Sequence, residues 1–300
     1  MRRLNKKVIL LQAVLLILTV SLSAQRVKSP GNTIPSVKLS NGIEMPILGF
    51  GTLELNDTIG VNSVAQAIAL GYRLFDTATI YGNEEAVGKG IKKSGINREE
   101  LFITTKLWVS DAGYESTKAA FNRSLQKLGV EYVDLYLIHR PRGDIYGAWK
   151  AMEELYEEGK IRAIGVSNFE SDQLESLIAN TKIKPMVNQI ECHPFFQQYE
   201  AQDFMQKLGI QVEAWSPFAG GRNNIFSNAT LVAIGKKYNK TAAQVALRWL
   251  IQREIVTIPR TSTPEYMQEN LDIFDFELNK ADMEQIGALD LGVTQFPEWE

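Results

Sequence analysis

The sequence predicts a (β/α)8 TIM barrel, an α/β fold, preceded by a small β-hairpin. Eight short apolar runs rich in β-branched residues alternate with amphipathic helical stretches, and 300 residues suffice for one such barrel. A doubly wound open sheet would instead require a Gly-x-Gly-x-x-Gly turn after its first strand. Glu54 stands where the third glycine would follow Gly49 and Gly51, so the barrel is favoured.

The predicted hairpin comes before the barrel. Val37–Leu39 and Ile43–Met45 flank Asn41-Gly42, and Asn-Gly between such runs is a strong signal for a two-residue turn. The eight barrel strands follow, and they read as apolar because both faces of a parallel sheet are buried. They are Ile47–Phe50, Arg73–Asp76, Leu101–Lys106, Val133–His139, Ile161–Ser167, Met186–Glu191, Gln211–Ser216 and Val256–Pro259.

Helical patterns fill the intervals between these strands. Ala148–Glu158 carries apolar side chains at spacings of three and four, and Gly159 ends it. Typical N-cap and first-turn residues predict further helix starts. They are Asn168 or Ser171 for the next helix and Thr263 with Pro264 for the last.

The first residues differ from the rest of the chain. Residues 1–24 combine a positive start, an apolar run over Val8–Val20 and small residues at the end, which predicts a secretory signal peptide. An uncleaved membrane anchor is the alternative. Residues 25–35 read as a flexible linker, and residues 36–300 as a single barrel domain. We therefore expect a periplasmic or secreted protein that contacts a membrane only if the leader stays attached.

Composition excludes several kinds of partner. Lys plus Arg number 32 against 35 for Asp plus Glu, so no basic surplus exists to bind nucleic acid. One cysteine, Cys192, cannot form an internal disulfide. With only two histidines, His139 and His193, we expect no metal site. We expect a monomer that acts on a small molecule.

Polar residues follow the apolar strands, where a barrel of this class carries its chemistry. These strand-end residues are Asp76, Lys106, His139, Ser167 with Asn168, Gln189, Trp215 with Ser216, and Arg260. Three motifs contain several of them. They read Asp76-Thr-Ala-x-x-Tyr81-Gly-Asn-Glu, Thr105-Lys106-Leu107-Trp108 and Leu137-Ile138-His139-x-Pro141.

In these motifs the chain resembles the aldo-keto reductases of the compact prokaryotic type, over about Ser36–Asp290. The resemblance implies an NAD(P)H-dependent oxidoreductase that reduces an aldehyde, ketone or sugar carbonyl to an alcohol. It also implies four catalytic residues. Tyr81 would donate the proton, Lys106 and Asp76 would tune Tyr81, and His139 would orient the substrate.

Elementary chemistry supports the same roles. Hydride transfer to a carbonyl leaves negative charge on its oxygen, and an acid must protonate it. The pKa of a free phenol is about 10, and a neighbouring ammonium group lowers it. Lys106 can supply that charge to Tyr81, Asp76 can hold Lys106 by an ion pair, and His139 can hydrogen-bond the carbonyl oxygen.

The resemblance further implies where a dinucleotide binds. The nicotinamide and pyrophosphate residues would be Gly51, Thr52, Ser167, Asn168, Gln189, Trp215, Ser216 and Phe218. The adenosine-phosphate residues would be Arg260, Thr261, Ser262, Thr263, Tyr266, Glu269 and Asn270. Tyr266 stands where NADPH-preferring relatives carry an arginine, so only Arg260 retains the charge. We expect NADPH, with NADH as the alternative.

Substrate contacts are expected from Leu53, Trp108 and Arg140, besides His139. Arg140 either meets an anionic substrate or forms a rim salt bridge with Asp144. Near the chain's end, Phe296 and Trp299 either fold over the pocket mouth or form a frayed apolar end.

Two other functions compete with a reductase. One is a cofactor-binding barrel with a sensing or partner-binding role. The other is a secreted glycosidase, which would need two carboxylates at one sugar site. Asp76, Glu191 and Glu213 are available, but Asp76 is expected to form an ion pair with Lys106. His193 is expected to brace its loop and not to take part in catalysis.

Overall fold

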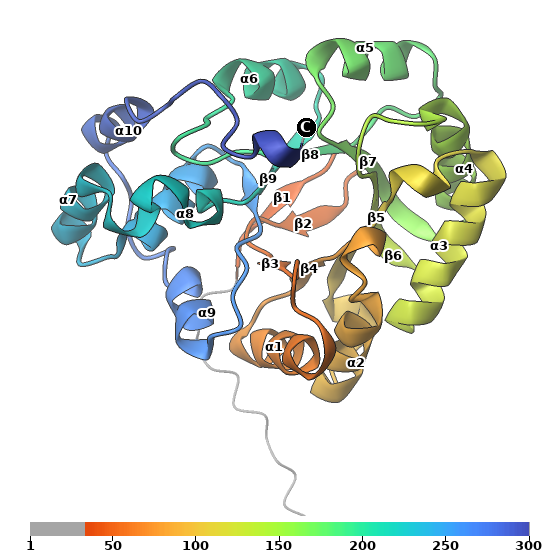
Figure 1. Cartoon of the computed structure of the whole chain (residues 1–300), viewed down its shortest axis with the longest axis horizontal. Helices are drawn as coiled ribbons and strands as arrows, with labels where there is room; N and C mark the ends of the chain where they lie inside the picture. Colours follow the sequence, from red (N-terminus) through yellow and green to blue (C-terminus); the bar gives the residue numbers. More distant parts are fainter. Residues whose placement is uncertain (1–33, 300) are drawn as a thin grey trace, which may run out of the picture. The chain divides into compact units, whose positions relative to one another are not determined.

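Eight parallel strands form the wall of a barrel in the computed structural model, which describes residues 34–299 (Figure 1). Hydrogen bonds connect them in the order β10-β9-β8-β7-β6-β5-β4-β3, and a parallel bridge between Leu48 and Thr257 joins the two ends of the sheet. The strands are β3 (Phe50–Gly51), β4 (Leu74–Asp76), β5 (Phe102–Leu107), β6 (Val133–Ile138), β7 (Ile161–Ser167), β8 (Val187–Glu191), β9 (Gln211–Trp215) and β10 (Val256–Thr257). The predicted barrel is therefore confirmed.

The junction between the first and last strands departs most from the predicted bounds. Gly49 N donates to Thr257 O at 2.8 Å, and Gly51 N donates to Pro259 O at 3.1 Å. Pro259 accepts but has no N–H to donate, so the ladder ends there and β10 is short. Gly51 is required at this seam, because a Cβ there would lie 2.7 Å from the backbone oxygen of Ile258.

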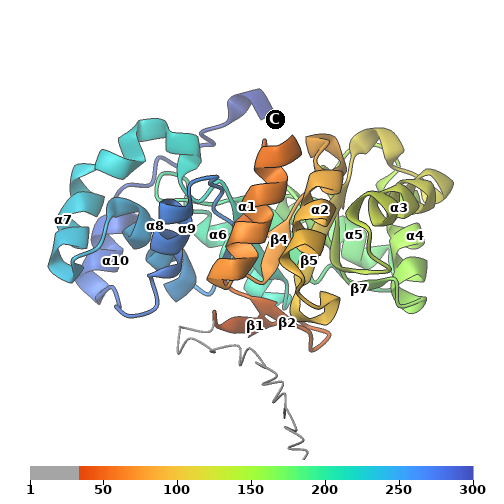
Figure 2. The same cartoon turned by 90° about the horizontal axis from the view of Figure 1, so that it is seen from below.

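Helices cover the outside of the barrel (Figures 1 and 2). They are α1 (Asp57–Leu70), α2 (Glu84–Ser94), α3 (Tyr114–Leu128), α4 (Ile145–Glu157), α5 (Ser171–Ala179), α6 (Tyr199–Lys207), α7 (Ala229–Tyr238), α8 (Ala242–Gln252), α9 (Pro264–Leu271) and α10 (Lys280–Gly287). α7 and α10 are additions to the strand–helix alternation. The expectation that the helix at Thr263 and Pro264 is the last was therefore wrong, because α10 follows it.

Capping explains where two helices begin. Asp144 accepts from Gly147 N at 2.8 Å, so α4 starts three residues before the predicted Ala148. Glu170 caps α5 in a capping box with Gln173. Asn168 does not begin this helix: its backbone has φ +61°.

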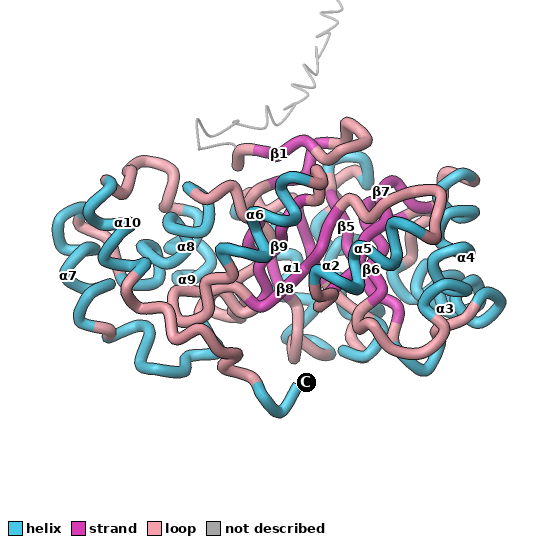
Figure 3. The backbone as a smooth tube through the Cα atoms, turned by 90° about the horizontal axis from the view of Figure 1, so that it is seen from above, coloured by secondary structure: helices cyan, strands magenta, loops and turns pink. Residues whose placement is uncertain are grey.

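The hairpin pairs β1 (Ser36–Lys38) with β2 (Glu44–Pro46) in antiparallel register. Its loop has three residues and not the predicted two, because Leu39 N bonds Ile43 O and Gly42 takes φ +90°. Figures 2 and 3 place this hairpin at one end of the barrel and the C-terminal turn η5 (Pro297–Trp299) at the opposite end. The hairpin thus leaves the carboxyl ends of the strands open for a site.

The predicted leader, residues 1–24, and nearly all of the linker lie outside the described residues. Between residues 34 and 299, no helix is long and apolar enough to cross a membrane. The same range contains no cluster of His, Cys, Asp and Glu side chains that could hold a metal ion.

Candidate active site

A cavity of about 660 Å³ opens at the carboxyl ends of the strands. Nearly every residue that the sequence singles out lines it. These lining residues are Gly51, Thr52, Leu53, Asp76, Tyr81, His139, Arg140, Ser167, Asn168, Gln189, Trp215, Ser216, Phe218, Arg260, Thr261, Ser262, Thr263 and Tyr266. The fold therefore gathers side chains from all around the barrel into one concave site, as expected for this architecture.

Asp76, Lys106 and Tyr81 form a connected group that can hold a proton at the cavity wall, with Asp76 and Lys106 buried and Tyr81 half-buried. Lys106 Nζ lies 2.5 Å from Asp76 Oδ1 and 3.0 Å from Thr77 O. It also lies 3.5 Å from the hydroxyl of Tyr81. Tyr81 ends the short turn η1 (Thr79–Tyr81) that follows β4, so the strand that supplies Asp76 also places the phenol. Lys106 itself is fully buried and lies behind Tyr81, outside the cavity wall.

Burial and charge set the protonation of these groups in opposite directions. Burial raises the pKa of Tyr81, and the Lys106 ammonium only partly offsets it. The sequence-based expectation that Lys106 lowers this pKa thus describes the smaller effect. Burial acts to lower the pKa of Lys106, but Asp76 and Tyr81 more than compensate and raise it. At neutral pH the phenol keeps its proton and the ammonium keeps its charge.

His139 directly follows β6 and lies beside Tyr81 at the cavity. Its ring lies edge-on to Tyr81, with centroids 5.8 Å apart, and to Trp108 at 5.1 Å. Burial, with the charges of Lys106 and Arg140, holds the pKa of His139 well below its usual value. The imidazole is therefore neutral, and its Nδ1 has no partner among the described residues. Trp108 supports the histidine and does not itself line the cavity.

Amide and hydroxyl groups form one side of the cavity. Asn168 Nδ2 donates to His139 O at 3.0 Å and to Ser167 Oγ at 2.9 Å, and its Oδ1 accepts from Trp215 Nε1 at 2.8 Å. Ser167 Oγ in turn donates to Gln189 O at 2.9 Å. These bonds hold the indole ring of Trp215 and the amide side chain of Asn168 in fixed positions around the cavity.

The far end of the cavity carries hydroxyl groups and one paired cation. Thr261, Ser262 and Thr263 line the wall between β10 and α9. Arg260 Nη2 bonds Glu54 Oε2 at 2.7 Å, and both side chains are exposed. The charge expected to meet a phosphate is thus already matched by a carboxylate from the loop after β3.

Two residues predicted at this end do not line the cavity. Glu269 accepts from Thr241 Oγ1 at 2.5 Å, and Asn270 is buried. An adenine contact from either one remains a prediction. Tyr266, which does line the cavity, is 58% exposed.

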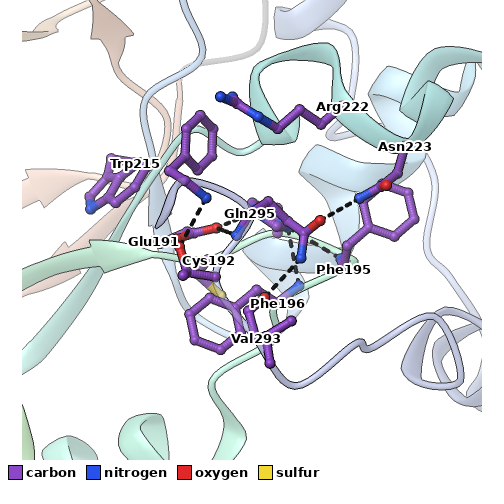
Figure 4. A network of polar contacts seen from close by, with 12 residues as sticks. Glu191, Cys192, Phe195, Phe196, Trp215, Arg222, Asn223, Val293 and Gln295 are labelled. Atoms are coloured by element: carbon purple, nitrogen blue, oxygen red, sulfur yellow. Dashed lines mark hydrogen bonds and ion pairs between the residues drawn. The ribbon is translucent and has the colours of Figure 1, made fainter. Parts of the chain in front are cut away.

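The C-terminal segment covers the cavity. Phe296 is buried and packs against Trp215, with ring centroids 5.1 Å apart, while Trp299 lies 5.4 Å from the same indole. Of the two alternatives drawn from sequence, folding over the mouth is thus the one observed. Glu191 anchors the segment: its carboxylate accepts from Thr294 Oγ1 at 2.5 Å and from Gln295 N at 2.8 Å (Figure 4).

His193 completes this anchor. Its Nε2 lies 2.9 Å from Glu191, and its Nδ1 accepts from the backbone N–H groups of Phe195 and Phe196. It is fully buried, in keeping with the bracing role expected for it. Glu191 and Glu213 do not line the cavity. Of the three carboxylates considered for a glycosidase, only Asp76 lines it, and Asp76 is ion-paired with Lys106.

Comparison with known proteins decides the family. The model of the aldo/keto reductase family matches residues 47–291. The chain belongs to the aldo/keto reductase family. It is 52% identical to the glyoxal reductase of Bacillus subtilis (strain 168) over 262 residues, which is 87% of this chain and 94% of that protein.

Solved structures show the same relationship. An aldo/keto reductase from Brucella melitensis has a TM-score of 0.83 and 49% identity, covering 86% of this chain and all of that one. The Bombyx mori aldo-keto reductase, crystallised with NADP, has a TM-score of 0.82 and 34% identity, covering 88% and 95%. The expectations of an aldo-keto reductase fold and of an NAD(P)H-dependent oxidoreductase acting on carbonyl groups are confirmed.

The cavity of this aldo-keto reductase suits a nicotinamide dinucleotide. Gln189 and Asn168 offer polar amide atoms, and Trp215 offers an aromatic face. At the other end Arg260 offers the charge a phosphate needs, with neighbouring hydroxyl groups. His139 Nδ1 is an orphaned buried polar atom. The residues therefore fit the family's cofactor.

Sequence reasoning missed some cavity residues. Glu54 lines it from the loop after β3, and Arg222 and Phe226 line it from the 3-10 segment η4 (Ala219–Ser227). In neither segment does a local sequence pattern indicate where the side chains point. Glu213 was considered only as a glycosidase carboxylate. It lies on β9, and its carboxyl group accepts from the side-chain amide of Gln189 on β8. The signal for it exists, because Glu213 precedes Trp215 by two residues and side chains two apart share one face of a strand.

Proposed function

We propose that this protein reduces aldehydes or ketones with NADPH, with Tyr81 as the proton donor. The observation that supports the proposal is the line of contacts from Asp76 through Lys106 to the Tyr81 hydroxyl, which ends at the cavity opposite His139. The bound cofactor would supply the hydride. The chain itself supplies a held proton and two oriented polar groups.

The roles follow from the protonation states. Tyr81 keeps its proton until an alkoxide forms next to it, and Lys106 then stabilises the phenolate that remains. Asp76 keeps Lys106 in place and charged. His139 is neutral, so it would donate a hydrogen bond to the carbonyl oxygen and would not compete as an acid. Phe296 and Trp215 help exclude water from this point.

NADPH is proposed over NADH because Arg260 offers a bidentate contact to a phosphate. The NADP complex of the Bombyx mori relative supports this choice. The pairing of Arg260 with Glu54 weakens the preference, since a phosphate must compete with that carboxylate. Both cofactors are therefore to be titrated.

The proposed substrates are small reactive aldehydes, including dicarbonyls of the kind named for the Bacillus subtilis relative. Leu53 and Arg140 line the cavity. Because Arg140 lies next to His139 in the chain and carries a guanidinium group, we propose that it contacts substrates that bear a carboxylate; a rim salt bridge with Asp144 is the alternative.

The test follows oxidation of NADPH by glyoxal and by an aromatic aldehyde in the parent chain and in Tyr81→Phe. Loss of a general acid should lower kcat at least about 100-fold, with NADPH affinity unchanged. Tyr146→Phe is the matched control, because Tyr146 is exposed and bonds Ser176 outside the cavity. Binding of NADPH without turnover in the parent would refute the reductase and favour the sensing role.

Export and a monomeric state are proposed from the sequence alone. A fusion of residues 1–35 to a reporter that is active only outside the cytoplasm tests the first. Processing near Ala24, read by N-terminal sequencing, distinguishes cleavage from anchoring. Light scattering of the purified chain tests the second, since one chain has a mass of 33.7 kDa.

A further inference from the structure

Glu213 is a buried carboxyl group to which the proposed mechanism gives no task. It lies on β9 with no exposed surface. Its Oε2 accepts from Gln189 Nε2 at 2.9 Å, and its Oε1 has no partner within the described part of the chain. Burying a carboxyl group costs free energy. Because Glu213 contacts Gln189, which lines the cavity, it can position that side chain.

The side-chain amide of Gln189 shows that use. Its nitrogen carries two hydrogens, and both are taken: one goes to Asp76 Oδ2 at 2.9 Å and one to Glu213 Oε2 at 2.9 Å. A flipped amide would set its carbonyl oxygen against Asp76 Oδ2, an oxygen of the carboxylate that pairs with Lys106, and the two oxygens would repel each other. The amide orientation is therefore fixed, and Gln189 can offer the cavity only its carbonyl oxygen, an acceptor.

Glu213 matters here because Asp76 is shared. Asp76 Oδ1 is committed to Lys106 at 2.5 Å, so only its Oδ2 remains for Gln189. A single bond would leave the second amide hydrogen buried without an acceptor, a state that costs free energy. Two carboxyl groups, one from β4 and one from β9, hold the amide from two directions.

We propose that Glu213 is a positioning residue which, together with Asp76, holds Gln189 as a hydrogen-bond acceptor for the primary amide of the nicotinamide ring. This inference rests on the proposed function, because it requires the nicotinamide end of the dinucleotide to lie at Gln189. The consequence is selectivity between dinucleotides. The site favours a pyridine ring whose substituent carries an N–H donor over a ring of the same shape whose substituent has none.

Isothermal titration calorimetry with two dinucleotides tests this proposal without relying on turnover. One is NADP⁺, and the other is its 3-acetylpyridine analogue, in which a methyl group replaces the amide NH₂ and cannot donate. Glu213→Leu removes the acceptor at similar volume. We expect Kd for NADP⁺ to rise about tenfold, with Kd for the analogue nearly unchanged. Glu213→Gln, whose carbonyl can still accept, should recover most of the discrimination.

Glu153→Leu is the matched control. Glu153 is also buried and accepts from the backbone N–H groups of Lys182 and Ile183 at 2.8 Å, but it does not line the active-site cavity. This variant should lose stability and keep the parent ratio of the two Kd values. A ratio that shifts in Glu213→Leu alone supports the positioning role.

Two results would overturn it. Equal weakening of both dinucleotides in Glu213→Leu would show a general structural effect, and an unchanged ratio would show that Asp76 alone holds Gln189. Failure of the proposed function reads differently. Binding of NADPH without turnover would refute the reductase and leave the Kd ratio as the test of Glu213, whereas a parent chain that binds neither dinucleotide would overturn both proposals.

Discussion

Replacing Glu213 by Gln should change how the stability of the barrel depends on pH. Burial, and next the charge of Asp76, raise the pKa of Glu213 from 4.5 to about 8. In the unfolded chain the same group ionises near its ordinary value. Between these two values the native state holds a proton that the unfolded state has released. The parent protein therefore loses stability as pH rises through this window.

The size of the effect follows from the shift. Each pH unit inside the window costs about 1.4 kcal/mol, and the window from 4.5 to about 8 spans about 3.5 units. The loss is thus at most about 5 kcal/mol, an upper limit because relaxation and water entry reduce the cost of a buried charge. Glutamine does not titrate, and its carbonyl oxygen can still accept from Gln189 Nε2.

The assay is thermal unfolding of the parent and Glu213→Gln from pH 5 to pH 8. Near pH 5 the two should melt together within a few degrees, and by pH 8 the variant should melt up to about 10 °C higher, at about 2 °C per kcal/mol for a large domain. Glu85→Gln is the control: Glu85 is exposed beside Lys89, which lowers its pKa, so its melting difference should stay flat across this range. A gap between Glu213→Gln and the parent that stays constant or narrows with rising pH would refute the reasoning.

Three further substitutions test the cavity. Arg140→Ala should raise KM about tenfold for aldehydes that carry a carboxylate; an equal rise for neutral aldehydes would contradict the anion contact. Glu54→Gln frees Arg260 from its ion pair, so calorimetry should show NADPH binding a few-fold tighter while NADH changes little; an unchanged ratio would mean that Arg260 does not meet the phosphate. Phe296→Ala removes the ring that packs on Trp215 and should lower the free energy of unfolding by about 3–5 kcal/mol. It should also raise KM for apolar aldehydes more than it lowers kcat. Unchanged kinetics would show that the C-terminal segment does not contribute to substrate binding.

The sequence by itself determined the order of the elements and the residues that can do the chemistry. Apolar runs flanked by capping residues are local signals, and each strand end lies next to its run in the chain. Asp76, Lys106 and His139 could therefore be placed at one rim before any contact was known. The first strand was the weakest of these predictions, because its bounds depend on bonds to Thr257 and Pro259 at the far end of the chain.

Only the tertiary structure decided which groups meet across the barrel. Gln189 bonds carboxyl groups of β4 and β9, and Arg260 pairs with Glu54 across 206 positions of sequence. These contacts depend on closure of the sheet and on the register between neighbouring strands, which no short stretch of sequence encodes. The pKa values follow from the same closure, because burial in the assembled barrel, and not local sequence, keeps the proton on Tyr81 and on Glu213.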